Sequence, residues 1–342
     1  MLENPSQLLL RNLAIFEEGP LLISQAPRDE LAATLVSEGL KPLMHHSDYL
    51  AYQGSRRHLG DNAQFAPVPA GQARHGVLFI PKAKEELRMQ LAALAACVGK
   101  GGNLYVIGEN KGGIKSAAKL LEPYGQVEKL DSARHCSLFV VTLSEQPAPF
   151  VLNDWQHQHE IEVAGESLII CSLPGVFSHG ELDQGTRLLL EHLPRVKAQG
   201  RILDFGCGAG VIGAYLARKA PQAQVEMLDV SALAIAASHA TLAANGLDNA
   251  KVQPGSGLGD LHGRFHQIIT NPPFHTGVGT DYSATESLLR EAPARLVQGG
   301  DLVVVANSFL RYEPIMAAGF GKVERLADDR KFRVYCCRGS GR

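Results

Sequence analysis

Arg201-Ile202-Leu203-Asp204-Phe205-Gly206-Cys207-Gly208-Ala209-Gly210 is an apolar run that ends in a glycine-rich turn, and it decides the fold. The residues after it, 211–219, are predicted to form a helix. A strand, a glycine turn and a helix in this order are typical of α/β units that bind a nucleotide-like cofactor, because glycines let the backbone turn tightly and approach a ligand closely. The sequence therefore predicts a cofactor at this turn.

Two cofactors are compatible with the glycines alone. The segment 208–213 also satisfies G-x-G-x-x-G, the pattern of dinucleotide-binding turns. Asp204 stands directly before the glycines, where its carboxylate would repel a pyrophosphate but would suit a cationic amino-acid group. This charge favours S-adenosylmethionine over a dinucleotide.

The segment after the turn extends the same unit. A predicted strand over 225–229 ends in Asp229, about 20 residues beyond the glycines, which is the position suited to hydrogen-bonding both ribose hydroxyls. Ser231 is predicted to cap the next helix, and Ser256 lies in a turn expected over the adenine. The helix is predicted to present one apolar face, made of Leu233, Ala236, Ala240, Ala244 and Leu247.

A second site feature is Ile268-Ile269-Thr270-Asn271-Pro272-Pro273-Phe274, a predicted buried strand that stops at two prolines. Proline cannot donate to a sheet, and the first proline restricts Asn271 to an extended conformation, so the tip is a stiff turn. The turn offers an amide side chain, backbone acceptors and an aromatic face. Together these suit a flat substrate that carries an amino group.

The chain contains an internal duplication of one α/β domain. Three stretches recur in the same order with a nearly constant offset, each pair occupying the same place in an α/β pattern. The matching stretches are 101–107 and 299–305, 127–130 and 323–326, and 77–81 and 268–272. With a polar, proline-bearing link over 144–149, we expect domains at 1–150 and 151–342.

Composition excludes several classes of protein. The chain has 342 residues, 45% of them hydrophobic, and a formal net charge of −2, so it has no overall basic footprint for nucleic acid. The six cysteines show neither C-x-x-C nor regular spacing, so neither a zinc site nor a disulfide framework is indicated. The N-terminal residues do not resemble a signal peptide, and we expect a cytoplasmic protein.

The motifs at 204–210, Asp229 and 271–274 resemble those of class I S-adenosylmethionine-dependent methyltransferases that act on exocyclic amines. The whole-chain layout is similar to the family that methylates guanine N2 in small-subunit ribosomal RNA. The resemblance implies an α/β fold with two tandem Rossmann-like methyltransferase domains, each a seven-stranded mixed sheet flanked by helices. The first copy lacks the glycine turn and the Asn-Pro-Pro-Phe, so it is degenerate and we expect no cofactor there.

The resemblance also assigns roles to residues. It implies a lead-in over 175–186 that helps close over the cofactor, S-adenosylmethionine, and no metal. The catalytic candidates are Asn271, Pro272, Pro273 and Phe274. The cofactor-binding candidates are Asp204, Phe205, Gly206, Cys207, Gly208, Gly210, Asp229, Val230, Ser256, Asn271, Phe177 and Thr186.

The chemistry expected of the catalytic turn follows from the amine. If the Asn271 side-chain oxygen and the Pro272 carbonyl both accept hydrogen bonds from the amino group, they hold it facing the methyl donor. Phe274 would then stack on a guanine that is flipped out or already single-stranded.

The implied substrate is guanine 1207 of 16S rRNA within the 30S subunit, methylated by a monomer whose first domain supports the second and recognises RNA. That domain carries 15 Lys and Arg against 16 Asp and Glu over residues 1–155, which favours a folded particle over naked RNA. Three alternatives remain at this stage. They are a guanine methyltransferase of 23S rRNA, a glutamine methyltransferase of release factors, and a non-catalytic RNA-binding assembly factor.

Overall fold

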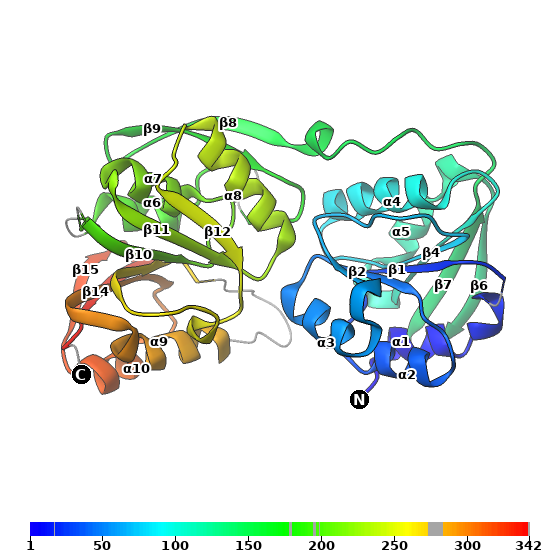
Figure 1. Ribbon diagram of the computed structural model, residues 1–342, viewed down its shortest axis with the longest axis horizontal. Helices are drawn as coiled ribbons and strands as arrows, with labels where there is room; N and C mark the ends of the chain where they lie inside the picture. Colours follow the sequence, from blue (N-terminus) through cyan, green and yellow to red (C-terminus); the bar gives the residue numbers. More distant parts are fainter. Residues whose placement is uncertain (17, 178–179, 194–195, 198, 273–282, 341–342) are drawn as a thin grey trace. The chain divides into compact units, whose positions relative to one another are not determined.

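The computed structural model describes residues 1–16, 18–177, 180–193, 196–197, 199–272 and 283–340 (Figure 1). The chain divides into two compact units, residues 1–155 and 156–342, so the division follows Trp155. Within the described residues, every helix is too short or too polar to span a lipid bilayer.

The first unit is built on a seven-stranded sheet. Five strands run parallel, β7 lies antiparallel to β5, and the edge strand β6 lies antiparallel to β7. The strands in spatial order are β3 (Ala63–Phe65), β2 (Leu43–His46), β1 (Leu21–Ser24), β4 (His75–Phe79), β5 (Asn103–Glu109), β7 (Cys136–Thr142) and β6 (Val127–Ala133). The central strand β1 is buried along its whole length, as expected of a strand covered on both faces.

Helices cover both faces of this sheet. Leucines of α1 and α2 pack with Ile23 and Tyr105 in one apolar cluster, whereas leucines of α4 pack with Leu22 and Val106 in another. The helices are α1 (Asn4–Leu10), α2 (Leu31–Ser37), α3 (Tyr49–Leu59), α4 (Lys84–Val98) and α5 (Ile114–Lys119). The unit is therefore a three-layer α/β structure.

The second unit has a seven-stranded sheet of the same design. Its strands in spatial order are β12 (Ala250–Pro254), β11 (Gln222–Asp229), β10 (Gln199–Phe205), β13 (Phe265–Thr270), β14 (Leu296–Asn307), β16 (Phe332–Arg338) and β15 (Val323–Asp328). The pairs β14–β16 and β15–β16 are antiparallel and the others are parallel. A separate antiparallel hairpin, β8 (His157–Val163) and β9 (Glu166–Ser172), precedes this sheet in sequence.

Five helices flank the second sheet (Figure 1). Side chains of α9 and α10 join the apolar cluster on one face, and α6, α7 and α8 contact the strands from the other side. Their bounds are α6 (Gln184–Glu191), α7 (Val211–Lys219), α8 (Ala232–Ala244), α9 (Ser283–Arg295) and α10 (Glu313–Phe320).

The duplication and the fold class predicted from the sequence are confirmed. Both sheets have the same spatial order of strands, with β1 to β7 of the first unit matched by β10 to β16 of the second. The three pairs of recurring stretches fall on β5 and β14, β6 and β15, and β4 and β13. Two tandem mixed sheets flanked by helices are thus the architecture of the chain.

The equivalence extends to the residue that follows the central strand. The Gln25 N–H donates to the His45 carbonyl at 2.9 Å, and the Gly206 N–H donates to the Leu228 carbonyl at 2.8 Å. Both residues have left-handed backbones, with φ of 61° for Gln25 and 73° for Gly206. In the first unit the Gln25 side chain lies at this bend, and its Nε2 donates a hydrogen bond to Ser47 Oγ at 2.8 Å.

The predicted apolar face of α8 is wrong. The buried side chains of the helix include Ala234, Ala237, Ser238 and Thr241, whereas Ala244 is exposed. An alanine-rich helix carries apolar side chains on every side, so its pattern does not select a face. The buried face of α8 carries Ser238 and Thr241, whose hydroxyls donate hydrogen bonds to the glycine turn.

Candidate functional site

A cavity of about 350 Å³ opens at the carboxyl ends of the strands of the second sheet. This is where open α/β sheets bind ligands. Many of the residues predicted from the sequence line it, although they come from separate segments of the second unit. The predicted residues in its wall are Phe177, Thr186, Phe205, Gly206, Cys207, Gly208, Asp229, Val230, Ser256, Asn271 and Pro272.

The remaining candidates lie elsewhere. Asp204 and Gly210 are packed behind the wall, against helix α7. Pro273 and Phe274 lie outside the described residues. The cavity is also lined by Asp183, which the sequence did not single out.

Asp229 and the glycine turn fix one another. The Gly208 N–H donates to Asp229 Oδ2 at 2.9 Å, and the Ser231 N–H donates to Oδ1 at 2.9 Å. Each carboxylate oxygen can accept more than one hydrogen bond, so both can still receive a hydroxyl. Asp229 is therefore a rigid acceptor in the cavity wall. Ser231 also caps α8, its Oγ accepting from Ala234 N at 3.3 Å, as the sequence predicted.

Close packing explains the later glycines of the motif. A Cβ on Gly213 would come within 2.5 Å of Met227 Sδ, and a Cβ on Gly210 within 2.9 Å of Ser238 Oγ. Only glycine allows α7 to lie this close to β11. Gly210 and Gly213 thus support the turn on the side away from the cavity. Gly208 borders open space, because a Cβ on it would meet nothing within 4 Å.

Asp204 is a buried acid beneath the turn. Its side chain has no exposed surface, and its Oδ2 accepts from the Gly213 N–H at 2.8 Å. Its other oxygen, Oδ1, has no hydrogen-bond partner among the described residues. Burial raises the pKa of Asp204 to about 7, with the nearby charge of Asp229 adding to the rise and the Gly213 N–H opposing it. The group can therefore change charge near neutral pH.

Two hydroxyls of α8 hold the glycine turn from the other side. Ser238 Oγ donates to the Gly208 carbonyl at 2.9 Å, and Thr241 Oγ1 donates to the Ala209 carbonyl at 2.8 Å. Thr241 Oγ1 also accepts from the Cys171 N–H of β9 at 3.0 Å. Sequence reasoning missed these residues. The available signal was two hydroxyl side chains three residues apart in an otherwise apolar helix.

Asn271 is oriented by the N-terminus of α6. Its Nδ2 donates to Asp183 Oδ2 at 2.9 Å and to Thr186 Oγ1 at 2.8 Å. Asp183 is the N-cap of α6, and the same Oδ2 accepts from the Thr186 N–H at 2.8 Å. The cap thus fixes Asp183, and Asp183 in turn fixes Asn271.

These contacts settle which way the Asn271 amide faces. An ionised carboxylate only accepts hydrogen bonds, so the atom beside Asp183 must be the NH2 group. Both amide hydrogens are then used within the protein. The amide therefore offers the cavity its oxygen, Oδ1, which is a pure acceptor. Such a wall binds a group that donates, for example an amine, and is poorly matched to a carbonyl.

The residues present fit S-adenosylmethionine. A carboxylate held by two backbone N–H groups suits a ribose diol, and the backbone at the turn is free of side chains where a ligand approaches. The buried acid Asp204, with one unpaired oxygen, favours a cation above the turn rather than a pyrophosphate. A cavity of about 350 Å³ is within the usual range for small-molecule sites.

Comparison with protein families and known proteins gives consistent matches. The family described as "Methyltransferase small domain" matches residues 167–336, and "Methyltransferase small domain N-terminal" matches residues 6–159. A Pseudoalteromonas atlantica protein named Ribosomal RNA small subunit methyltransferase C is 46% identical over 344 residues, covering 99% of this chain and 100% of that protein. A Pseudomonas fluorescens protein of the same name is 45% identical over 337 residues, covering 98% of each chain.

A solved structure shares the fold. The T. thermophilus 16S rRNA N2 G1207 methyltransferase, in complex with AdoMet and guanosine, matches with a TM-score of 0.85 and 24% sequence identity. The match covers 98% of this chain and 92% of that one. The two-unit architecture is therefore common to both proteins along nearly their whole length.

Proposed function

Because the chain belongs to the ribosomal RNA small subunit methyltransferase C family, we propose that it transfers a methyl group from S-adenosylmethionine to the exocyclic N2 of a guanine in 16S rRNA. The observation that carries the proposal is the fixed Asn271 amide, which presents an acceptor to a donating group. The guanine equivalent to G1207 of the T. thermophilus enzyme's substrate is the proposed target.

Asn271 and Pro272 act on the amino group by holding it in place. The N2 lone pair of guanine is delocalised into the ring, so it is a poor nucleophile until the amine is held in place. The two N2 hydrogens are bonded by Asn271 Oδ1 and the Pro272 carbonyl, which directs the nitrogen toward the methyl group. Fixing reactants in this way contributes about 7 kcal/mol or more, so a strong base is not required.

The remaining candidates hold the cofactor in the proposed reaction. S-adenosylmethionine, when bound, supplies an electrophilic methyl group. Asp229 accepts from the ribose hydroxyls, Gly206 and Gly208 let the backbone approach, and Val230 and Ser256 border the adenine. Phe177, of which 59% is exposed at the cavity, covers the cofactor from the lead-in. Phe274 stacks on the base.

The proposed roles give the site its selectivity. An amide with both hydrogens engaged cannot donate, so a base that presents a carbonyl at this position leaves two acceptors facing each other. A mismatch of this kind leaves buried polar groups unpaired and costs about 1–3 kcal/mol each. The guanine N2 edge, which donates two hydrogens, avoids this cost.

The biological setting is part of the proposal. The substrate is rRNA within the 30S subunit, in the cytoplasm, and the enzyme acts as a monomer. Residues 1–150 support the catalytic residues 151–342 and recognise RNA. The first unit has nearly balanced charge, which is poorly suited to holding naked RNA through phosphates alone.

The test is to map the methylated nucleotide. Unmodified 30S subunits, protein-free 16S rRNA, 23S rRNA and a release factor are incubated in separate reactions with the enzyme and labelled S-adenosylmethionine, and the RNA is digested for nucleoside mass spectrometry. We expect N2-methylguanosine at a single position, formed faster on subunits. Label on 23S rRNA or on a release factor would reassign the substrate. If the protein bound S-adenosylmethionine but transferred no methyl group to any of these substrates, the remaining alternative would be a non-catalytic RNA-binding assembly factor.

A further inference from the structure

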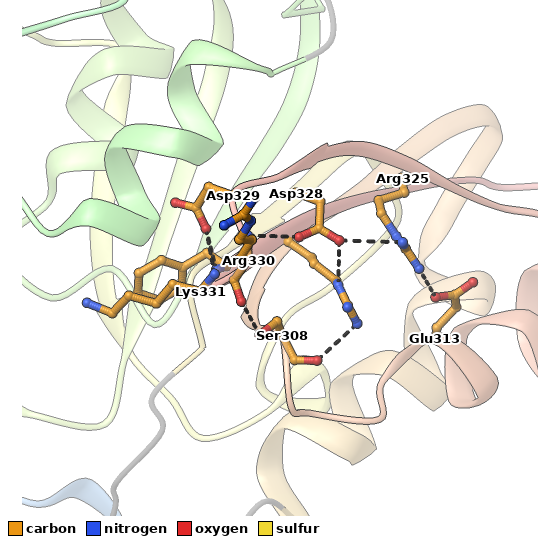
Figure 2. Close-up of polar contacts among 9 residues, drawn as sticks. Ser308, Glu313, Arg325, Asp328, Asp329, Arg330 and Lys331 are labelled. Carbon is orange, nitrogen blue, oxygen red and sulfur yellow. Dashed lines mark hydrogen bonds and ion pairs between the residues drawn. The ribbon is translucent and has the colours of Figure 1, made fainter.

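Two turns of the second unit are tied into one rigid surface, which we name the turn platform: residues 308–311 after β14 and 328–331 between β15 and β16. Ser308 Oγ donates to the Arg330 carbonyl at 2.6 Å, and the Ser308 N–H donates to the Lys331 carbonyl at 2.9 Å. Arg333 Nη1 donates to the Ser308 carbonyl at 2.9 Å. Figure 2 shows these contacts as a continuous network.

The acidic side chains of the platform are used internally. Asp328 Oδ1 accepts from the Arg330 N–H at 3.0 Å, and its Oδ2 accepts from Arg333 Nε at 2.8 Å. Asp329 Oδ1 accepts from the Lys331 N–H at 3.0 Å (Figure 2). The turn therefore keeps its shape, with Arg330 in a left-handed conformation at φ 75°. Its acids are engaged in the turn.

The platform lies at the same edge of the sheet as Asn271. Thr270 pairs with Val304 in the parallel strands β13 and β14, and Asn307 ends β14 opposite Phe332 of β16. Lys331 Nζ donates to Gln184 Oε1 at 3.0 Å, and Gln184 stands directly between Asp183 and Gly185 of the helix start that holds Asn271. The platform is thus joined to the residues that orient the proposed catalytic amide.

Cations and one aromatic ring face outward from this surface. Arg311, Arg330 and Lys331 are exposed, and Phe309 is 64% exposed. The turn platform, residues 308–311 and 328–331, has three basic and two acidic side chains, a net charge of +1, whereas the whole chain carries −2. A local excess of positive charge beside an exposed ring suits a nucleic acid backbone with an unpaired base.

We propose that the turn platform binds the single-stranded rRNA segment next to the target guanine. This inference rests on the proposed function. Arg311 and Arg330 contact phosphates, and a neighbouring base stacks on Phe309. Because the turns are held by hydrogen bonds within the protein, the backbone that carries these cations is already fixed before RNA arrives, and only the side chains have to be ordered on binding.

The first test removes the two arginines together, as Arg311→Gln with Arg330→Gln. Among the described residues neither guanidinium makes a hydrogen bond or an ion pair, so we expect unchanged melting temperature, S-adenosylmethionine affinity and kcat. The KM for unmodified 30S subunits should rise about tenfold, as for the loss of charge-assisted hydrogen bonds. The slope of log affinity against log salt should become shallower by about 1.4, since each single-strand phosphate contact contributes about 0.7.

A matched control lies on the same hairpin. Lys322 is exposed and directly precedes β15, at the opposite end of that strand from Asp328. Lys322→Gln combined with Lys251→Gln, a change in β12, removes the same charge away from the platform. Glu226, which lies 3.8 Å from Lys251 Nζ, keeps its ion pair with Arg201. The control should leave KM and the salt slope near the values of the unchanged protein. Equal effects of the control and the platform variant would overturn the proposal, because only net charge would then matter.

The second test identifies the partner chemically. A benzophenone amino acid replaces Phe309, the full chain is irradiated on 30S subunits, and the crosslinked component is identified. Crosslinking to 16S rRNA near the methylated guanine supports the platform. Crosslinking to a ribosomal protein, or none while methylation proceeds, overturns it. The crosslinking result does not depend on turnover. If the unchanged protein failed to methylate rRNA, that would contradict the proposed function but would not by itself contradict RNA binding at the turn platform.

Discussion

Asn271 and Asp183 are 88 residues apart in sequence, yet the amide nitrogen of one donates to the carboxylate of the other at 2.9 Å. The bond couples a helix cap to the proposed catalytic turn. The cap needs an acceptor at residue 183, and the amide needs an acceptor-only group there. An aspartate meets both needs with one charged oxygen, Oδ2, whereas an asparagine would offer only a neutral oxygen.

Asp183→Asn should therefore lower kcat while leaving the fold intact. Asparagine caps helices as well as aspartate, so α6 keeps its start. Its neutral oxygen accepts weaker hydrogen bonds than a carboxylate does, so the Asn271 amide is held less firmly. We expect kcat to fall about ten- to a hundredfold, corresponding to about 1.4–3 kcal/mol, with the melting temperature little changed. Thr186→Ser, which keeps the hydroxyl, is the control; a Asp183→Asn variant with normal kcat would contradict the orientation argument.

Asn271→Ala separates chemistry from cofactor binding. Loss of an acceptor that acts on the reacting amine should reduce kcat about a hundred- to a thousandfold, the range seen when a group that stabilises the transition state is removed. Calorimetry should show S-adenosylmethionine affinity within about threefold of that of the unchanged protein. The opposite pattern, with affinity lost and kcat retained, would move Asn271 out of the catalytic role.

Asp204 predicts a pH dependence of stability. Its pKa in the folded protein, about 7, lies above the ordinary value of 3.8, so the folded state binds a proton that the unfolded state releases. The resulting stability is fully present below about pH 4, falls as the pH rises toward 7 and is absent above it, amounting to at most about 4 kcal/mol. Urea midpoints measured from pH 4.5 to 8 should show this fall relative to Asp204→Asn, in which the group cannot titrate. Parallel curves for the two proteins would show that Asp204 is ionised throughout.

The same carboxylate should affect the cofactor. Asp204→Asn keeps an acceptor for the Gly213 N–H but removes the charge, so a cationic ligand loses an attraction through a poorly screened interior. We expect S-adenosylmethionine to bind at least about tenfold more weakly at pH 8, measured by calorimetry. S-adenosylhomocysteine, which lacks the sulfonium charge, should lose less. An equal loss for both ligands would assign the attraction to the α-ammonium group that both carry, and no loss for either would contradict the prediction.

Gly213 gives a packing prediction. Gly213→Ala places a Cβ against Met227, whose Sδ, Cε and Cγ would all lie within 2.7 Å of it, and Met227 is completely buried. The free energy of unfolding should fall by about 1–3 kcal/mol. Gly257→Ala, where a Cβ meets nothing within 4 Å, should change it by less than about 0.5 kcal/mol. Equal values from denaturant titrations of the two variants would contradict the close approach of α7 to β11.

The sequence predicted the fold well because its strongest signals are local. The glycine turn after Phe205 and the proline stop after Asn271 each end a buried strand, and the apolar runs of the two halves recur in the same order. Such features follow from backbone restrictions that hold in any context. The bounds expected for α7, 211–219, match the structure for the same reason.

The role of Asp183 could not be predicted this way. Within its own segment the residue is an ordinary helix cap, and nothing nearby indicates that its second partner lies 88 residues later. The same limit applies to Ser238 and Thr241, whose acceptors belong to a turn about 30 residues earlier in the chain. Hydrogen bonds between distant segments depend on three-dimensional placement, which residue patterns along one segment do not carry.

Gln25 and Gly206 occupy the same bend in the two units, and both adopt a left-handed backbone. The bend is thus compatible with a full side chain, at a strain of about 1 kcal/mol that the bonds from Gln25 to Ser47 offset. Gly206, in contrast, borders the cavity of the second unit. Gln25 thus places a side chain at this bend in the first unit, whereas in the second unit Gly206 places none beside the cavity.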